Sequence, residues 1–118
     1  MTPPFRRMPT PEQRIESFRS FVARSPDDAF ARYSLAMALR SAGRLEEAVA
    51  EFEETVRRRP EYVPTYLMLG QVLEGLGRAD GARDAYEKGV EAARRAGDGH
   101  AQAEIGGALE ALRARGTT

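Results

Sequence analysis

The sequence predicts an all-α fold of about six antiparallel helices, and three observations support this prediction. Apolar residues recur with a constant 34-residue period, as Phe18, Phe52 and Tyr86 do. Within each unit they are spaced by three and four residues, the spacing of one helix face. A glycine, Gly43 or Gly77, divides each unit into halves and suits the left-handed turn that ends a helix. Each unit is therefore expected to be a pair of helices, and the units are expected to stack.

The first helix is expected over Pro11–Arg24. Thr10 and Gln13 have the spacing of a capping box, in which two side chains satisfy each other's backbone amides. Phe18 stands one full period before Phe52, so this helix has the register of a second helix in a pair. We interpret it as a half repeat, which is a second helix that lacks its first.

The two full repeats each begin with a helix that carries a small residue between large ones. Leu35, Ala36 and Leu39 form this stripe in the first repeat, and Leu69 and Gly70 take the first two places in the second. The second helix of each pair is expected to bury an alanine and an aromatic residue four positions later. In the first repeat this second helix has an acidic start and a basic end, which matches the helix dipole.

The last helix continues the pattern at a 36-residue step, which relates Ile105 and Gly106 to Leu69 and Gly70. The expected helices are Pro11–Arg24, Asp27–Ala42, Leu45–Arg58, Glu61–Leu76, Ala79–Ala96 and Gly99–Arg115. The expected organisation is one domain over 10–115, with a half repeat at 10–26, full repeats at 29–62 and 63–96, a capping helix at 98–115, a disordered tail at 1–9 and a short tail at 116–118.

Composition argues against several classes of protein. The 118 residues suit a single domain, and the absence of cysteine rules out a disulfide framework. Basic and acidic side chains balance at 18 each, whereas a general nucleic-acid-binding protein carries a basic excess. No segment approaches the roughly 20 apolar residues of a membrane helix, and the first ten residues lack the apolar run of a secretory signal. We therefore expect a cytoplasmic protein that binds neither nucleic acid nor membrane.

The repeat resembles the tetratricopeptide repeat family, whose 34-residue motif runs W-x2-L-G-x2-Y, then A-x3-F, then P. The matching residues are Arg32, Leu35, Ala36, Leu39, Ala48, Phe52 and Pro60 in the first unit, and Tyr66, Leu69, Gly70, Leu73, Ala82 and Tyr86 in the second. The motif's aromatic residue is replaced by Arg32, and Arg94 stands where the second proline would fall. Leu39 and Leu73 replace its tyrosine. The resemblance implies a right-handed superhelix in which the first helices line a concave groove.

Candidate catalytic residues are scarce. His100 is the single histidine, and no second group stands in a spacing that would make it a base or a metal ligand. Several acidic residues of the second helices have basic partners at i,i+4, as Glu53 has Arg57 and Asp84 has Lys88, which is typical of a solvated helix face. We expect no enzymatic activity, no metal site and no cofactor.

The strongest candidate for a binding surface begins with four consecutive large apolar residues, Tyr66 to Leu69. A surface helix needs only one apolar stripe, and Tyr66 and Leu69 supply it, so Leu67 and Met68 are expected to face the groove. An apolar cluster with a polar rim is typical of a partner site, and methionine adapts to different shapes. The expected partner-binding groove consists of Phe30, Tyr33, Ser34, Met37, Arg40, Leu67, Met68, Gln71, Glu74 and Glu104.

The expected function is a protein-interaction module that binds an apolar or amphipathic segment of another protein or peptide in this groove. Family members that clamp a terminal carboxylate of chaperone tails use several polar and basic groove residues, whereas here Arg40 is the only cation in the expected groove. An alternative remains open, namely a self-associating structural protein that forms a homodimer through the groove, the N-terminal tail or the unpaired terminal helices. A further alternative is that neighbouring helices cover Leu67 and Met68, in which case the groove has no dedicated ligand.

Overall fold

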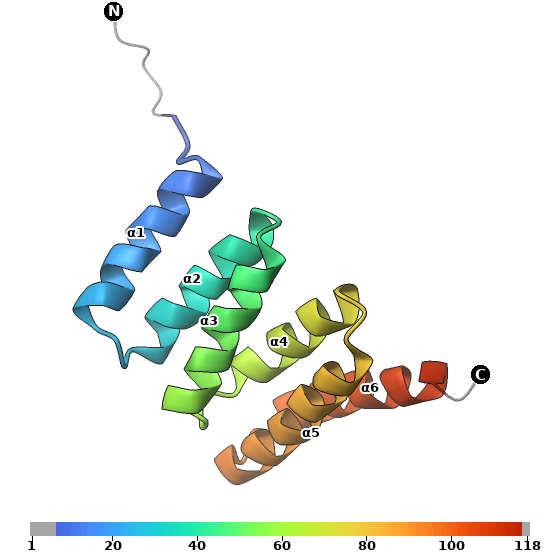
Figure 1. Ribbon diagram of the computed structural model, residues 1–118. Helices are drawn as coiled ribbons and strands as arrows, with labels where there is room; N and C mark the ends of the chain where they lie inside the picture. Colours follow the sequence, from blue (N-terminus) through green and yellow to red (C-terminus); the bar gives the residue numbers. More distant parts are fainter. Residues whose placement is uncertain (1–6, 117–118) are drawn as a thin grey trace, which may run out of the picture.

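The structure is a computed structural model that describes residues 7–116, and this part of the chain is all-α, as expected. Its helices are α1 (Pro11–Arg24), α2 (Ala29–Ser41), α3 (Leu45–Arg58), α4 (Pro64–Gly75), α5 (Ala79–Ala96) and α6 (Gly99–Gly116). They stack into an elongated molecule of 61 × 31 × 24 Å, with α1 and α6 at its two ends (Figure 1). Most of the expected N-terminal tail, residues 1–6, and the last two residues, 117–118, lie outside the described residues.

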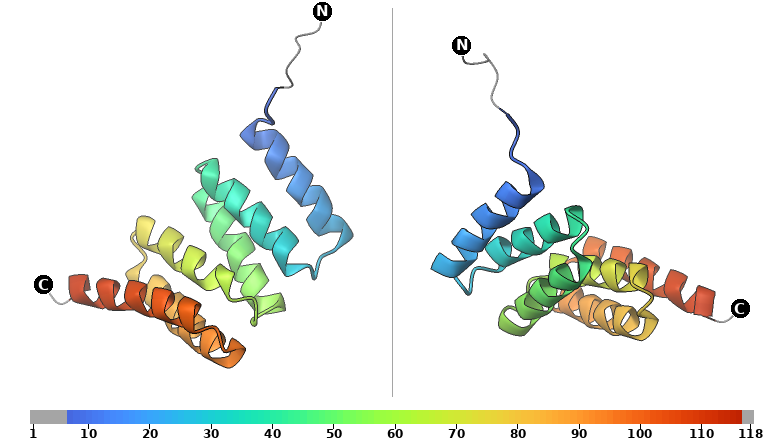
Figure 2. Two further views of the ribbon diagram at one scale, coloured as in Figure 1. Left: turned by 180° about the vertical axis from the view of Figure 1, so that it is seen from behind. Right: turned by 45° about the horizontal axis from the view of Figure 1, so that its top comes forward.

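The helices of the two full repeats and α6 form two layers. The second helices α3 and α5 lie in front in Figure 1. The first helices α2, α4 and α6 come to the front in the left-hand view of Figure 2, which shows the molecule from behind. A first helix packs both against its own second helix and against the preceding one, as α4 does against α5 and α3. Buried side chains from all six helices form one continuous core, which includes Ile15, Leu35, Leu39, Phe52, Leu69, Leu73, Tyr86, Ile105 and Leu109.

The N-terminal ends of α1 and α2 are fixed by side-chain caps. Thr10 and Gln13 form the expected capping box, with N–H···O distances of 3.1 and 2.9 Å. Helix α2 begins at Ala29 and not at Asp27, because Asp28 is its N-cap. The Asp28 carboxylate accepts a backbone N–H of the first turn at 3.0 Å. The sequence pattern therefore placed this start two residues too early.

The boundaries of α4 and α6 also differ from expectation. Helix α4 begins at Pro64 and not at Glu61, because proline suits the first turn, where its missing N–H has no helical partner. It ends before a turn in which Gly77 has φ +76°, as Gly43 has φ +77° after α2. Helix α6 includes Gly116, which the sequence placed in the C-terminal tail.

The close approach of α4 and α5 depends on two glycines. A Cβ at Gly70 would lie 2.6 Å from Cδ1 of Tyr86, and a Cβ at Gly89 would lie 2.5 Å from Cβ of Tyr66. Both distances are well below carbon–carbon contact, so each large side chain occupies the space that only a glycine leaves open. This is the physical reason for the small-and-large pattern that repeats along the sequence.

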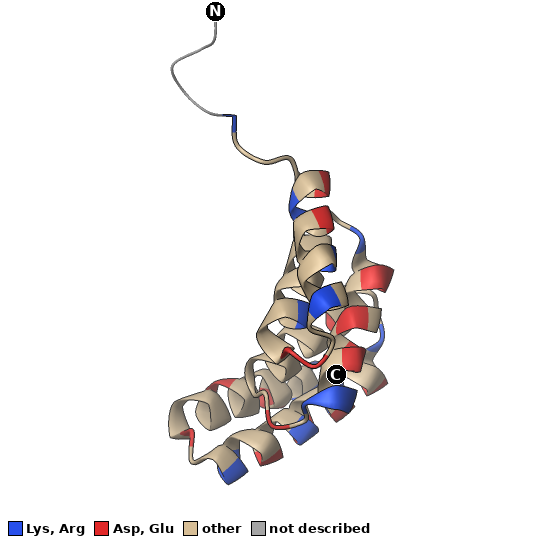
Figure 3. Cartoon of the chain, turned by 90° about the vertical axis from the view of Figure 1, so that its left-hand side faces the viewer, with Lys and Arg blue, Asp and Glu red and all other residues tan. Residues whose placement is uncertain are grey.

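Charges are concentrated on the second helices. Seven of the fourteen residues of α3 are charged, whereas α4 carries only Glu74. Figure 3 shows that the charged segments gather mainly along one side of the stack of helices. One ion pair recurs with the 34-residue period, since Arg44 pairs with Glu12 at 2.9 Å and Arg78 pairs with Glu46. Each pair links the start of a second helix to the turn of the next repeat. The face formed by the first helices is left comparatively free of charge.

Candidate functional site

The candidate site is the face formed by the first helices α2, α4 and α6, called here the first-helix face. Arg40 on α2 connects it across two repeats, because its Nη1 donates to Sδ of Met68 at 3.1 Å. Its Nη2 donates to Oε1 of Gln71 at 3.3 Å. The structure therefore brings together three of the ten residues expected in the groove.

The aromatic residues of α2 lie at its N-terminal half and differ in exposure. Phe30 is 65% exposed, so its ring is available to a partner. Tyr33 is half-buried, and its ring meets Phe52 and Tyr62 at centroid distances of 6.0 and 5.7 Å. Burial raises the pKa of the Tyr33 hydroxyl further above neutral pH, at which a tyrosine is already protonated. Tyr33 thus presents a fixed, neutral edge beside the more exposed Phe30.

The acidic residues expected at one side of the groove behave differently from each other. Glu74 on α4 accepts a hydrogen bond from the hydroxyl of Tyr86 and pairs with Arg115 of α6. Burial and this hydrogen bond raise the pKa of Tyr86. Glu104 on α6 is exposed, and within residues 7–116 it pairs with none of the other groove residues. Glu74 is therefore a structural link between helices, whereas Glu104 is a solvated charge.

The apolar residues at the start of α4 are less exposed than we would expect of two side chains that lie open on the floor of a groove. Leu67 and Met68 are half-buried and pack against the core. The guanidinium of Arg40 lies against the sulfur of Met68, which covers part of it. Within residues 7–116, Met8, Phe21 and Phe30 are the large apolar side chains that remain mostly exposed. Phe30 is the one of these that belongs to the expected groove.

A hollow of ≈ 410 Å³ lies between α1 and α2 and uses other residues of the expected groove. Tyr33, Ser34 and Met37 of α2 line it together with Arg14 and Phe18 of α1. Eight of the ten expected residues are thus divided between this hollow, the Arg40 contact and the α6 side of the face, whereas Phe30 and Leu67 belong to none of these groups.

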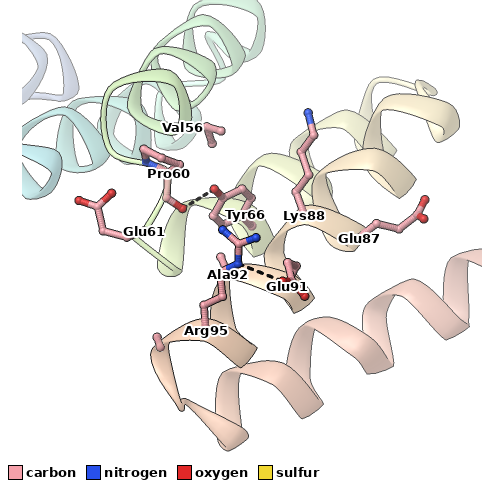
Figure 4. Close-up of a pocket in the computed structure, with 10 residues that line it drawn as sticks. Val56, Pro60, Glu61, Tyr66, Glu87, Lys88, Glu91, Ala92 and Arg95 are labelled. Carbon is pink, nitrogen blue, oxygen red and sulfur yellow. Dashed lines mark hydrogen bonds and ion pairs between the residues drawn. The ribbon is translucent and has the colours of Figure 1, made fainter.

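A second hollow, on the opposite side of the molecule, was not foreseen from the sequence. It measures ≈ 710 Å³ and lies between α3, the start of α4 and α5 (Figure 4). Val56 and Ala92 supply apolar lining, and Tyr66 closes one side with its hydroxyl donating to the carbonyl of Pro60. The recurrence of Val56 at Val90, one period later, was the available signal that this side is also apolar.

Phe21 on α1 also escaped sequence reasoning. It is 53% exposed, and the guanidinium of Arg24 lies 5.0 Å from its ring centroid. The signal was present in the 34-residue alignment, where Phe21 falls on Thr55 and Gly89, two smaller residues. A large residue at a position that is small in both full repeats indicates a face with no covering helix.

The next question is what residues 7–116 could bind, apart from another protein. No group of three His, Cys, Asp or Glu side chains among residues 7–116 is arranged to hold a metal ion. No described helix combines the length and apolar character needed to cross a membrane. What the first-helix face offers is contact area: one exposed aromatic ring, half-buried apolar side chains and a few polar groups.

The comparisons with known proteins agree with this architecture. A family model described as tetratricopeptide repeat matches residues 39–112. TPR repeat-containing protein PA0015 of Pseudomonas aeruginosa is 32% identical over 91 residues, which is 77% of this chain and 87% of that protein. The solution structure of a tetratricopeptide repeat domain protein from Salinibacter ruber is 39% identical, with a TM-score of 0.71, and the match covers 75% of this chain and 89% of that one.

A more distant structure has the same fold. PcrH of Pseudomonas aeruginosa, solved in complex with the chaperone binding region of PopD, superposes with a TM-score of 0.80 at 20% identity. The match covers 86% of this chain and 77% of that one. The 34-residue period, the paired helices and these matches lead to one conclusion: the chain belongs to the tetratricopeptide repeat family.

Proposed function

We propose that this protein is a non-catalytic interaction module that holds an apolar or amphipathic peptide segment of another protein on its first-helix face. The observation that carries the proposal is that the first helices carry few charges and present the exposed ring of Phe30 together with half-buried Tyr33, Leu67 and Met68. A few aromatic anchors surrounded by apolar and polar contacts typically supply most of the binding energy of a peptide site.

The chemistry of the face suggests the kind of segment it accepts. Arg40 links α2 to α4 on this face, and the solvated Glu104 lies on α6, so a ligand with apolar anchors and a basic residue toward α6 would match it. Tetratricopeptide proteins generally act as interaction modules, and PcrH has been solved with a segment of its partner. Both facts support a peptide ligand of this kind and leave the partner's identity to experiment.

The test begins by selecting ligands. Random 12-residue peptides are displayed and selected on the full chain, and a fluorescently labelled selected peptide is titrated by anisotropy. Phe30→Ser should raise the Kd by about tenfold or more, because an exposed aromatic anchor is lost without disturbing the core. Replacing Leu67 and Met68 together with serine should abolish binding, provided that circular dichroism shows the helices intact.

The matched control is Phe21→Ser, which removes an exposed phenylalanine from α1 and not from the first-helix face. Its Kd should equal that of the unmodified chain. Equal binding by Phe30→Ser and the unmodified chain, or loss of binding in Phe21→Ser alone, would show that the peptide is held elsewhere.

A further inference from the structure

The outward face of α1 carries two aromatic side chains, Phe18 and Phe21, that the described helices leave partly or mostly uncovered. Phe18 has the register of Phe52 and Tyr86, which are both 0% exposed, yet Phe18 is only half-buried. Phe21 has the register of Thr55, which is 1% exposed, yet Phe21 is 53% exposed. The terminal unit of a repeat array usually presents a polar outer face. This aromatic face is therefore the kind that another element covers.

Helix α6 has the complementary feature at the other end of the molecule. Gly106 corresponds to Gly70 at the 36-residue step, and Gly70 lies under the ring of Tyr86. A Cβ built at Gly106 meets nothing within 4 Å. Helix α6 thus has the glycine of a first helix without an aromatic ring on it, whereas α1 has the ring of a second helix without a glycine beneath it.

The sizes of the neighbouring residues also match between the two ends. Within the chain, Tyr66 packs against Gly89, with the large residue on the first helix. At the corresponding positions of the free ends, α6 carries Gln102 and α1 carries Phe21, so the large residue has moved to the second helix. A contact between α1 and α6 would therefore pair a large side chain with a smaller one, as the contact inside the chain does.

One position of each first helix reaches toward the next first helix. Arg40 contacts Met68 of α4, and Glu74, one period later, pairs with Arg115 of α6. Glu110 is the third member of this series and follows Glu74 at the 36-residue step. Its ion pair, at 3.6 Å, is with Arg113 of its own helix.

If another first helix preceded α2 in the array, its side chain at the position of Glu110 would lie in the hollow between α1 and α2. Arg14 lines it together with Ser34 and Met37. Arg14 forms no ion pair with another residue of the described range 7–116. A carboxylate in the place of Glu110 would therefore find an opposite charge in the hollow.

We infer that copies of this chain associate end to end, with α1 of one copy packing against α6 of the next. Phe18 of one copy lies on Gly106 of the other, as Tyr86 lies on Gly70 within the chain. Glu110 of that other copy enters the hollow beside Arg14. The interface joins two different surfaces, so each assembly keeps a free α1 and a free α6 and can grow into a longer array. This association uses the ends of the molecule and is independent of peptide binding.

The first experiment measures the mass of the full chain by sedimentation equilibrium across a concentration series that reaches about 1 mM. The average mass should rise with concentration without stopping at a dimer. Phe21→Ser and Gly106→Leu should each weaken association by about tenfold or more, since the first removes the large side chain placed against Gln102 and the second blocks the place of Phe18 on Gly106. Two controls make the same chemical changes elsewhere: Phe30→Ser, on the first-helix face, matches Phe21→Ser, and Gly107→Leu, at the next residue, matches Gly106→Leu. Both should leave association unchanged.

Mixing the two defective variants tests the polarity of the interface. Gly106→Leu keeps an intact α1, and Phe21→Ser keeps an intact α6, so each alone should be largely monomeric. Their mixture should form a one-to-one dimer that grows no further. A symmetric contact between two α1 helices would instead leave Gly106→Leu dimeric and the mixture no stronger, which would overturn the proposal.

Charge reversal tests the contact in the hollow without altering any buried residue. Arg14→Glu should weaken association, and the double variant that also has Glu110→Arg should recover it. A double variant as weak as the single one, or an unmodified chain that stays monomeric to the highest concentration, would contradict end-to-end association. Because Phe30→Ser affects peptide binding and not mass, failure of this proposal and failure of the proposed function give different results.

Discussion

The guanidinium of Arg40 on α2 donates a hydrogen bond to the sulfur of Met68 on α4, with an Nη1–Sδ distance of 3.1 Å. This contact covers part of Met68, the second of the two consecutive apolar residues that we expect to face the groove. A long, flexible cationic side chain can lay its apolar stem over a neighbour while its charged group stays near water. The cover over Met68 is therefore removable, unlike a packed core residue.

Removing this cover should expose apolar surface. Arg40→Ala is expected to increase the binding of the neutral dye Nile red, because Met68 and Leu67 become more accessible. The free energy of unfolding should change by less than about 1 kcal/mol, since the lost hydrogen bonds are on a partly solvated side chain. Arg94→Ala on α5, whose side chain is 60% exposed, is the control and should not change dye binding.

The glycine beneath Tyr86 should be intolerant of even one methyl group. Gly70→Ala is expected to lower the free energy of unfolding by about 1–3 kcal/mol, because the added Cβ would overlap the ring. Gly107→Ala, where a Cβ meets nothing within 4 Å, should raise it by about 0.5–1 kcal/mol by restricting the unfolded chain. Urea denaturation of both variants checks the prediction, and two changes of the same sign would contradict it.

Arg32 and Tyr66 perform the same task at equivalent positions of the two repeats. Arg32 donates from Nη2 to the carbonyl of Pro26 at 3.2 Å, and the hydroxyl of Tyr66 donates to the carbonyl of Pro60. Arg32 also pairs with the partly buried Glu51 at 2.8 Å. The arginine thus takes over the carbonyl contact that Tyr66 makes in the second repeat.

This equivalence predicts how substitutions at Arg32 change the stability of the fold. Arg32→Ala is expected to cost about 1–3 kcal/mol of unfolding free energy, because the Pro26 carbonyl and Glu51 lose their partner. Combining Arg32→Tyr with Glu51→Ala reproduces the residues of the second repeat and should restore stability to at least that of the unmodified chain. Thermal and urea unfolding measure both, and a double variant as unstable as Arg32→Ala would refute the equivalence.

The second helices should make the protein sensitive to acid. Hydrogen bonds from Arg57 and Arg58 lower the pKa of Glu54 from 4.5 to about 2, and those from Arg94 and Arg95 lower the pKa of Glu91 similarly. A carboxylate whose pKa is lower in the folded state stabilises that state above the unfolded pKa. This stabilisation is lost as the pH falls through the folded pKa.

The expected result is a free energy of unfolding that decreases between pH 4.5 and pH 2. Urea unfolding at a series of pH values measures this slope, and replacing Glu54 and Glu91 with glutamine should make it shallower. Both carboxylates are partly exposed to solvent, so high salt should also reduce the slope. An identical slope in the double variant would show that other groups dominate the acid response.

The fold was predictable because repetition makes many weak signals coincide. The residues that pack α4 on α5, such as Gly70 with Tyr86, recur in register along the chain, so their pattern survives individual departures. The starts of α2 and α4 were placed too early. Those boundaries depend on which residue caps the helix, here Asp28, and on Pro64, more than on periodicity.

The candidate site was less predictable than the fold. Periodicity indicates on which face Leu67 and Met68 lie, but it contains no information on where the long side chain of Arg40 reaches. The hollow beside Val56 was missed for a related reason, because it depends on how far apart two second helices stand. The exposure of Phe21 was available from the 34-residue alignment once its small counterparts were compared.

The central claim is that ligands bind on the first-helix face, and chemical-shift mapping tests it most directly. The ¹⁵N-labelled chain is titrated with a selected peptide at a concentration at which the chain alone is monomeric. Binding as proposed would shift the amide signals of Phe30, Arg40 and Gln71 on α2 and α4. Shifts confined to Val56, Ala92 and their neighbours between α3 and α5 would show that the opposite hollow is the binding site and would contradict the claim.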